Sequence, residues 1–152
     1  MRKSPSIPTI LNKNVSFIDS PGCWVFYTVL CLAFRVILAG LSLSSTVSWT
    51  IINWVHGVIT FFLFHWIKGA PFSSDHEHES ELLTFWEQID DQILYTRARK
   101  FLLLFPIALF FIAVDSSGWD LAYFWINSIV LIITVIPKLP FMHKVRLFGI
   151  NA

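Results

Sequence analysis

A cluster of acidic and imidazole side chains is the most suggestive set of potential metal ligands in the chain. Residues 75–79 read Asp-His-Glu-His-Glu, and imidazole and carboxylate groups are suitable ligands for zinc. The two histidines are only two positions apart, whereas the familiar helical zinc motif places them one turn apart on one face. We therefore interpret the segment as an exposed acidic stretch, and we expect no metal site and no cofactor.

Polar side chains also interrupt two long apolar segments at helical spacing. Asn53, His56 and Thr60 fall on one face of a helix, and Asn127 and Thr134 share a face of another. Such faces turn toward neighbouring helices, because lipid offers polar groups no partner. They could line a polar cavity for a substrate or an ion, but the pattern favours hydrogen bonding between helices.

Arg35 is the one charged residue within residues 23–43. We expect it to reach the membrane edge or to pair with Asp115. The apolar segments contain no further carboxylate for a proton relay, which argues against a transporter. Because no nucleophile-base-acid set, phosphate loop or cysteine-histidine cluster is evident, the sequence predicts no catalytic role.

The composition is typical of a membrane protein. Of 152 residues, 55% are hydrophobic and only 14% are charged, whereas about a quarter of the residues in soluble domains are charged. The net charge of +1 and the absence of a basic stripe argue against a nucleic-acid partner. Cys23 and Cys31 would lie about 12 Å apart along one helix, too far for a disulfide, so they do not indicate a redox compartment.

Four apolar segments predict an all-α integral membrane protein with four transmembrane helices. Residues 23–43 and 49–67 are each long enough to cross a hydrocarbon core of about 30 Å. Residues 101–114 and 121–136 are shorter, so they must borrow flanking residues or thin the bilayer. A soluble core helix is the competing interpretation for these two, but the flanking Lys100, Trp119 and Lys138 are typical of interfacial anchors.

A cytosolic amphipathic helix is expected between the second and third spans. The apolar residues of this segment fall at helical intervals: Leu82, Phe85, Trp86, Ile89 and Ile93. The acidic residues Glu81, Glu87, Asp90 and Asp91 take other positions. An acidic polar face favours packing on the bundle or on a protein partner over binding to anionic lipid.

Basic residues predict the orientation and the division of the chain. Apart from Arg35, every Lys and Arg lies in residues 1–22, 68–100 or 138–152, and basic residues collect on the cytoplasmic side. We therefore expect both termini and the central loop to be cytosolic. Residues 1–22 would form a retained cytosolic arm, 23–137 a four-helix membrane domain that includes the cytosolic loop 68–100, and 138–152 a cytosolic tail.

Several strings of the sequence resemble the ORM (ORMDL) family in content, order and spacing. They are HWIKGAPF at 65–72, WEQID at 86–90, TRARKFL at 96–102 and PKLPFMHKVRLFGIN at 137–151. The resemblance covers nearly the whole chain, from about residue 11 onward. It implies a multi-pass protein of the endoplasmic reticulum membrane that binds and inhibits serine palmitoyltransferase, the pyridoxal-phosphate enzyme that commits serine and acyl-CoA to sphingolipids.

The resemblance also implies how the regulator responds to lipid. In the family, the arm enters the neighbourhood of the enzyme's substrate tunnel, and ceramide held between arm and enzyme fixes the inhibitory pose. The matching residue is Asn14, whose amide can donate to and accept from the amide and hydroxyls of ceramide; the alternative is that Asn14 only shapes a turn.

We expect partner contacts in the arm, the loop and the tail, at Met1, Asn12, Trp86, His143 and Arg146. The expected partners are the large subunits of serine palmitoyltransferase, ceramide and membrane lipid. The principal alternative is an endoplasmic-reticulum membrane assembly factor or chaperone that acts indirectly on lipid synthesis.

Overall fold

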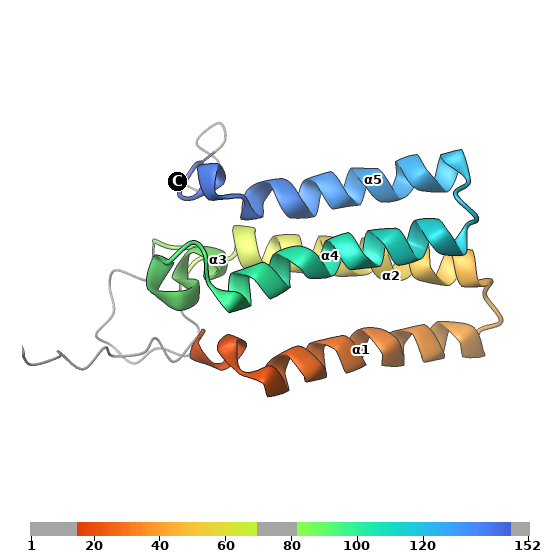
Figure 1. Cartoon of the computed structure of the whole chain (residues 1–152), viewed down its shortest axis with the longest axis horizontal. Coiled ribbons are helices and arrows are strands. Elements are labelled where there is room, and N and C mark those ends of the chain that lie inside the picture. The colour runs from red at the N-terminus through yellow and green to blue at the C-terminus, as the bar shows by residue number, and fades with distance from the viewer. Residues whose placement is uncertain (1–14, 70–81, 147–152) are drawn as a thin grey trace, which may run out of the picture.

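The computed structural model describes residues 15–69 and 82–146. Four long helices run side by side, α1 (Pro21–Gly40), α2 (Ser45–Phe61), α4 (Arg97–Ser116) and α5 (Leu121–Val135), and a short α3 (Phe85–Gln88) lies between α2 and α4 in the chain (Figure 1). Single helical turns complete the described regular structure: η1 (Ser16–Asp19), η2 (Phe62–Trp66), η3 (Ile89–Gln92), η4 (Ile136–Lys138) and η5 (Pro140–Met142). Within these residues all regular elements are helical, apart from an isolated bridge between Lys68 and Thr84. The all-α class is confirmed.

Three stretches are long and apolar enough to cross a membrane: Pro21–Gly40, Ser45–Trp66 and Leu121–Lys138. The helix α4 is as long as α1, at 20 residues, which corresponds to about 30 Å. Its first turn holds Arg97, Arg99 and Lys100 and its last turn holds Asp115, so its uncharged part is shorter. The described residues thus form a helical membrane protein with three candidate spans.

Side-chain caps decide where the long helices begin. Ser44 Oγ accepts from the Val47 amide at 3.3 Å, and Thr96 Oγ1 accepts from the Arg99 amide at 3.3 Å. A capping oxygen satisfies an amide that has no partner within its own helix. As a result α2 and α4 each begin four residues earlier than their apolar stretches do.

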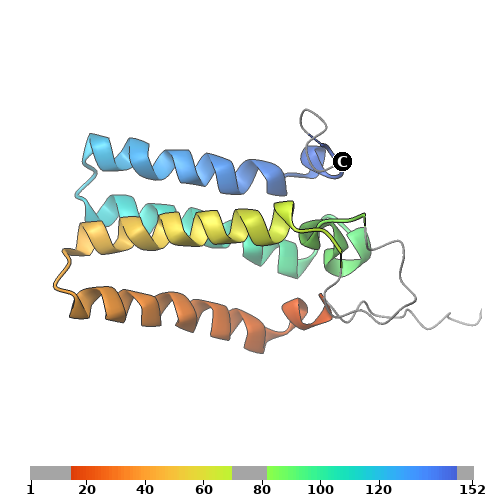
Figure 2. The same cartoon turned by 180° about the vertical axis from the view of Figure 1, so that it is seen from behind.

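The central part of the bundle consists of α2, α4 and α5, and α1 lies along its outer side (Figures 1 and 2). Gly57 marks the closest approach of α2 to α5. A Cβ on Gly57 would overlap the Val130 side chain and would lie 3.0 Å from Thr134 Cγ2. A residue without a side chain is therefore needed for this contact, as is common where membrane helices pack tightly.

The described chain starts and finishes at the same end of the bundle as α3, which we call the α3 end (Figures 1 and 2). The other end, the turn end, carries residues 41–44 and 117–120. The segment around α3 is less regular than the expected amphipathic helix, because Asp90 and Gln92 adopt positive φ values of 52° and 69°, which an α-helix excludes. Trp86 and Ile89 are buried as expected, whereas Leu82 and Ile93 are 72% and 62% exposed.

Candidate functional site

Hydrogen bonds fix α3 against the end of α2, although α3 is only four residues long. Thr84 and Glu87 form a capping box, in which the Thr84 amide donates to Glu87 Oε2 at 2.8 Å. Gln88 donates its side-chain amide to the carbonyls of Gly69 at 2.9 Å and of Leu83 at 3.1 Å. Together with the Lys68–Thr84 bridge, these contacts hold α3 in one position.

Trp86 lies within a buried cluster at the α3 end and is only 4% exposed. The other buried members of this cluster come from five further elements or turns: Val15, Ile18, Phe64, Ile89, Ala98 and Leu102. Val15 and Ile18 belong to the first described residues, so the cluster joins the base of the expected arm to the loop and to α4. In this structure Trp86 packs between these segments and holds them together. Its contact with a partner stays a prediction.

Two buried cations flank Trp86. The Lys138 ammonium donates to the Leu102 carbonyl at 2.8 Å and lies 5.4 Å and 5.8 Å from the ring centroids of Phe64 and Trp86. The Arg99 guanidinium lies 5.1 Å from the Trp86 ring and donates to the carbonyls of Glu87 at 3.3 Å and Ile89 at 3.1 Å. Carbonyl oxygens and aromatic faces thus replace the water that burial removes from these charges.

Glu87 connects α3 to the tail. Arg146 donates to both carboxylate oxygens of Glu87, at 2.7 Å and 2.8 Å, in the two-pronged geometry that makes arginine-carboxylate pairs strong. Burial raises the pKa of Glu87, but hydrogen bonds from Arg146 and Thr84 outweigh it and lower the pKa to about 2. Burial, followed by the charge of Arg99, lowers the pKa of the neighbouring His143. Glu87 is therefore ionised at neutral pH and holds the tail through Arg146.

The polar faces predicted for the membrane segments are buried between helices, as expected. Asn53 donates to Asn127 Oδ1 at 2.9 Å, which joins α2 to α5. Thr60 and Thr134 donate to carbonyls of their own helices, at 2.8 Å in each case. The Asn53–Asn127 contact fits hydrogen bonding between helices, the favoured interpretation of the pattern, whereas Thr60 and Thr134 bond within their own helices instead.

Arg35 lies near the turn end, with its guanidinium 5.8 Å from the centroid of the Trp49 ring. The expected pairing with Asp115 is not formed, and the Asp115 side chain is exposed. A cation over an indole face is a favourable arrangement, and tryptophan is typical of the membrane boundary. The other expected fate of Arg35, a position at the membrane edge, stays a prediction.

Some predicted site residues lie outside the described part of the chain. These are Met1, Asn12 and Asn14 in the arm and the acidic stretch at 75–79. Of the remaining predicted contacts, the structure brings Trp86, His143 and Arg146 together at the α3 end. They surround Glu87, which the sequence analysis had assigned to the polar face of the loop helix.

Sequence reasoning missed the convergence of Lys138, Arg99 and Glu87 on Trp86. Lys138 was expected at the membrane surface, but it is 5% exposed and packs against two aromatic rings. The sequence did contain a signal for this convergence. Trp86, Glu87, Arg99 and Lys138 all fall within the strings at 86–90, 96–102 and 137–151 that resemble the ORM family. Spacing within one helix could not reveal it, since the four residues come from three separate segments.

The fold and this site define a helical membrane protein whose loop, tail and first described residues are fastened together at one end of the bundle. Over residues 15–69 and 82–146, no group of three His, Cys, Asp or Glu side chains could hold a metal ion. A model of the ORMDL family matches residues 12–146. The chain belongs to the ORMDL family.

Relatives match the chain along almost its whole length. ORM1-like protein 2 of Bos taurus is 38% identical over 142 residues, which cover 93% of each chain. ORM1-like protein 2 of Homo sapiens is 37% identical and ORM1-like protein 3 of Mus musculus is 36% identical, both with the same coverage.

Proposed function

We propose that this protein is a non-catalytic regulatory subunit that binds serine palmitoyltransferase and inhibits it in response to ceramide. Membership of the ORMDL family over residues 12–146 is the observation that carries this proposal. The matched range begins just before Asn14 and ends at Arg146, so it includes the residue proposed to contact ceramide and the residue that fastens the tail. In this role the protein controls sphingolipid synthesis without performing a chemical step.

The proposal places the protein in the endoplasmic reticulum membrane with four crossings and both termini in the cytosol. The helix α4 would be a crossing in addition to the three candidate spans, since it packs against both α2 and α5 and is about 30 Å long. Of the eight Lys and Arg residues within the described ranges, seven lie in segments at the α3 end, and basic residues favour the cytosolic side. The eighth is Arg35.

The arm would act from the α3 end. Val15 and Ile18 are buried in the Trp86 cluster, and the Trp24 indole donates to the Ile18 carbonyl at 2.7 Å. The described chain therefore begins at a fixed point beside Trp86, at the residue that follows Asn14 in the sequence. The amide of Asn14 would donate to and accept from the polar groups of ceramide, in contact with the enzyme.

Affinity purification tests the direct partnership. The tagged protein, solubilised in mild detergent, is expected to recover the large subunits of serine palmitoyltransferase in a fixed ratio. Association with many unrelated membrane proteins, independent of lipid, would favour the assembly-factor alternative and contradict the proposal.

A further inference from the structure

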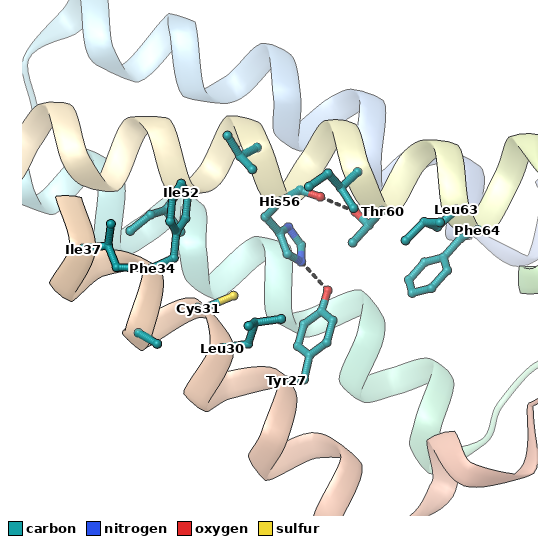
Figure 3. Close-up of a pocket in the computed structure, with 13 residues that line it drawn as sticks. Tyr27, Leu30, Cys31, Phe34, Ile37, Ile52, His56, Thr60, Leu63 and Phe64 are labelled. Atoms are coloured by element: carbon teal, nitrogen blue, oxygen red, sulfur yellow. Dashed lines mark hydrogen bonds between the residues drawn. The ribbon is translucent and has the colours of Figure 1, made fainter.

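A recess of about 480 Å³ lies between α1 and α2 (Figure 3). This volume is within the range of about 300 to 1,000 Å³ that is typical of small-molecule sites. Its walls are almost entirely apolar, with Leu30 and Phe34 on α1, Ile52 and Ile59 on α2, and Leu63 on the adjoining η2. We call this recess the α1–α2 groove.

The α1–α2 groove is long and narrow. Its lining extends from Tyr27 to Ile37 on α1 and from Ile52 on α2 to Phe64 on η2, which corresponds to about 15 Å and 18 Å of helix. Figure 3 shows Ile37 and Ile52 toward one end and Phe64 at the other. An occupant must therefore be elongated along the helix axes.

A polar pair ties the two walls together partway along the groove. The Tyr27 hydroxyl and His56 Nε2 are 2.5 Å apart and share a hydrogen bond (Figure 3). The Tyr27 ring also packs edge-on against Phe105 of α4, with centroids 4.7 Å apart. These contacts hold α1 close to the bundle, so the groove is a feature of the packed structure.

The rim of the groove opens toward the surroundings of the bundle. Leu30, Ile37 and Ile59, which line it, are 57%, 61% and 50% exposed. Because α1 and α2 are candidate spans, these surroundings are hydrocarbon chains. An apolar recess does not hold water, and an empty one forfeits dispersion contacts along its walls.

A partner helix does not fit into the groove. An α-helix with side chains is about 10 to 12 Å across, so 15 Å of it would occupy more than about twice the available 480 Å³. The hydrogen bond between Tyr27 and His56 keeps the walls too close for such an object. A single hydrocarbon chain is long and thin enough to lie between them.

We propose that the α1–α2 groove binds one acyl chain of a membrane phospholipid as an integral part of the folded protein. The bound chain completes the packing of α1, which is otherwise the most loosely attached long helix. This site is separate from the arm to which we assign ceramide, and it does not require the enzyme.

Photolabelling of the full-length protein tests this proposal. The protein is placed in phosphatidylcholine nanodiscs that contain a phosphatidylcholine with a diazirine in the middle of one acyl chain. Labelled residues are then identified by mass spectrometry after irradiation. Adducts are expected to concentrate on the groove lining and to be sparse on Leu32 and Val36, which are exposed on α1 outside the lining.

Two substitutions fill the groove from opposite walls. Ala33→Trp on α1 and Ile59→Trp on α2 are each expected to lower groove labelling by about tenfold. The control is Ala39→Trp, an identical change at an exposed position of α1 that does not line the groove. Circular dichroism checks that each variant keeps its helical content. Because the two groove-filling substitutions, the plugs, lie on different helices, the test still works if one of the two variants misfolds.

Three outcomes would overturn the proposal. Equal labelling of the lining and of the Leu32 and Val36 surface, unchanged by the plugs, would mean ordinary contact with bulk lipid. Absence of groove adducts would mean that no phospholipid chain enters. Labelling by a ceramide that carries the same diazirine chain, without labelling by the phosphatidylcholine, would assign the groove to a different lipid.

Discussion

Glu87 and Arg146 form the contact through which the loop and the tail constrain each other. They lie 59 positions apart in the sequence and are joined by two short hydrogen bonds. Arginine suits this place because its planar group meets both oxygens of a carboxylate at once, which lysine cannot do. Since the Glu87 carboxylate also accepts from the Thr84 amide, loss of Arg146 would leave a buried charge only partly satisfied.

Replacement of Arg146 by glutamine is expected to destabilise the α3 end by about 1.5 to 3 kcal/mol, the range for hydrogen bonds to charged groups. Hydrogen exchange should accelerate at residues 84–89 and 140–146, with little change in α1. Lys144→Gln is the control, because it removes the same charge from an exposed position two residues away. Equal acceleration in both variants would contradict the assigned role of Arg146.

The Glu87 carboxyl also predicts a dependence on pH. Its pKa falls from 4.5 to about 2 on folding, so the ionised form stabilises the fold above pH 4.5, and this contribution disappears as the pH falls toward 2. In detergent at neutral pH, the unfolding temperature of the wild type should be well above that of Glu87→Gln. The difference between the two unfolding temperatures should shrink in acid. A gap that stays constant down to about pH 3 would argue against the ion pair as its source.

Asn14 carries the proposed response to ceramide. Asn14→Ala is expected to leave the complex with serine palmitoyltransferase intact while weakening ceramide-dependent inhibition, because alanine lacks the amide donors and acceptor. Copurification measures assembly, and enzyme activity at increasing ceramide measures the response. An unchanged ceramide response in the reconstituted complex would show that Asn14 only shapes the chain.

The residues of the site could be predicted from the sequence only where one helix supplies the pattern. Asn53 and Asn127 fall on polar faces of single helices, and both are buried as predicted. The surroundings of Trp86 could not be derived in this way, because Phe64, Arg99 and Lys138 reach it from η2, α4 and η4. Such contacts depend on how the helices pack, which periodicity does not encode.

At the scale of elements, the contact between α2 and α5 is set by Gly57. The neighbouring Val130 is buried and β-branched, so its side chain has little freedom to turn away in a helix. Asn53 and Asn127 join the same two helices one turn farther along. Close packing and a hydrogen bond thus act together at this interface.

Gly57→Ala is expected to destabilise the bundle by about 1 to 3 kcal/mol, the usual cost of overpacking. Gly40→Ala is the control, since a Cβ at the last residue of α1 meets nothing within 4 Å. Thermal unfolding in detergent, followed by circular dichroism, compares the two variants with wild type. Matching unfolding temperatures for all three proteins would mean that α2 and α5 can separate without cost.

The long helices were predictable as elements, but their ends were not. Apolar stretches indicated the positions of α1, α2, α4 and α5, whereas Ser44 and Thr96 start α2 and α4 within polar sequence. The α3 segment was expected to be longer, since its apolar residues continue at helical spacing to Ile93. Positive φ values at Asp90 and Gln92 interrupt it, and local spacing carries no signal for them.

At the scale of the molecule, an even number of long helices brings both described ends to the α3 end (Figures 1 and 2). The first and last described residues, together with α3, therefore lie within reach of one partner. The proposed topology requires all of them to be cytosolic.

Glycosylation tagging tests the topology directly. Acceptor sites placed before residue 1, in the loop 70–81 and after residue 152 are expected to remain unmodified in endoplasmic-reticulum membranes, whereas a site at Ser42 in the turn end should be glycosylated. Modification is read as a shift in mobility that a glycosidase removes. If the two chain ends lay on opposite sides of the membrane, α4 would not be a crossing.

The most direct test of the proposed function is the activity of serine palmitoyltransferase in nanodiscs, with and without this protein, as ceramide is increased. We predict that ceramide lowers the activity only when the protein is present in the complex. The same ceramide response in the presence and absence of the protein, although it copurifies with the enzyme in a fixed ratio, would contradict the account.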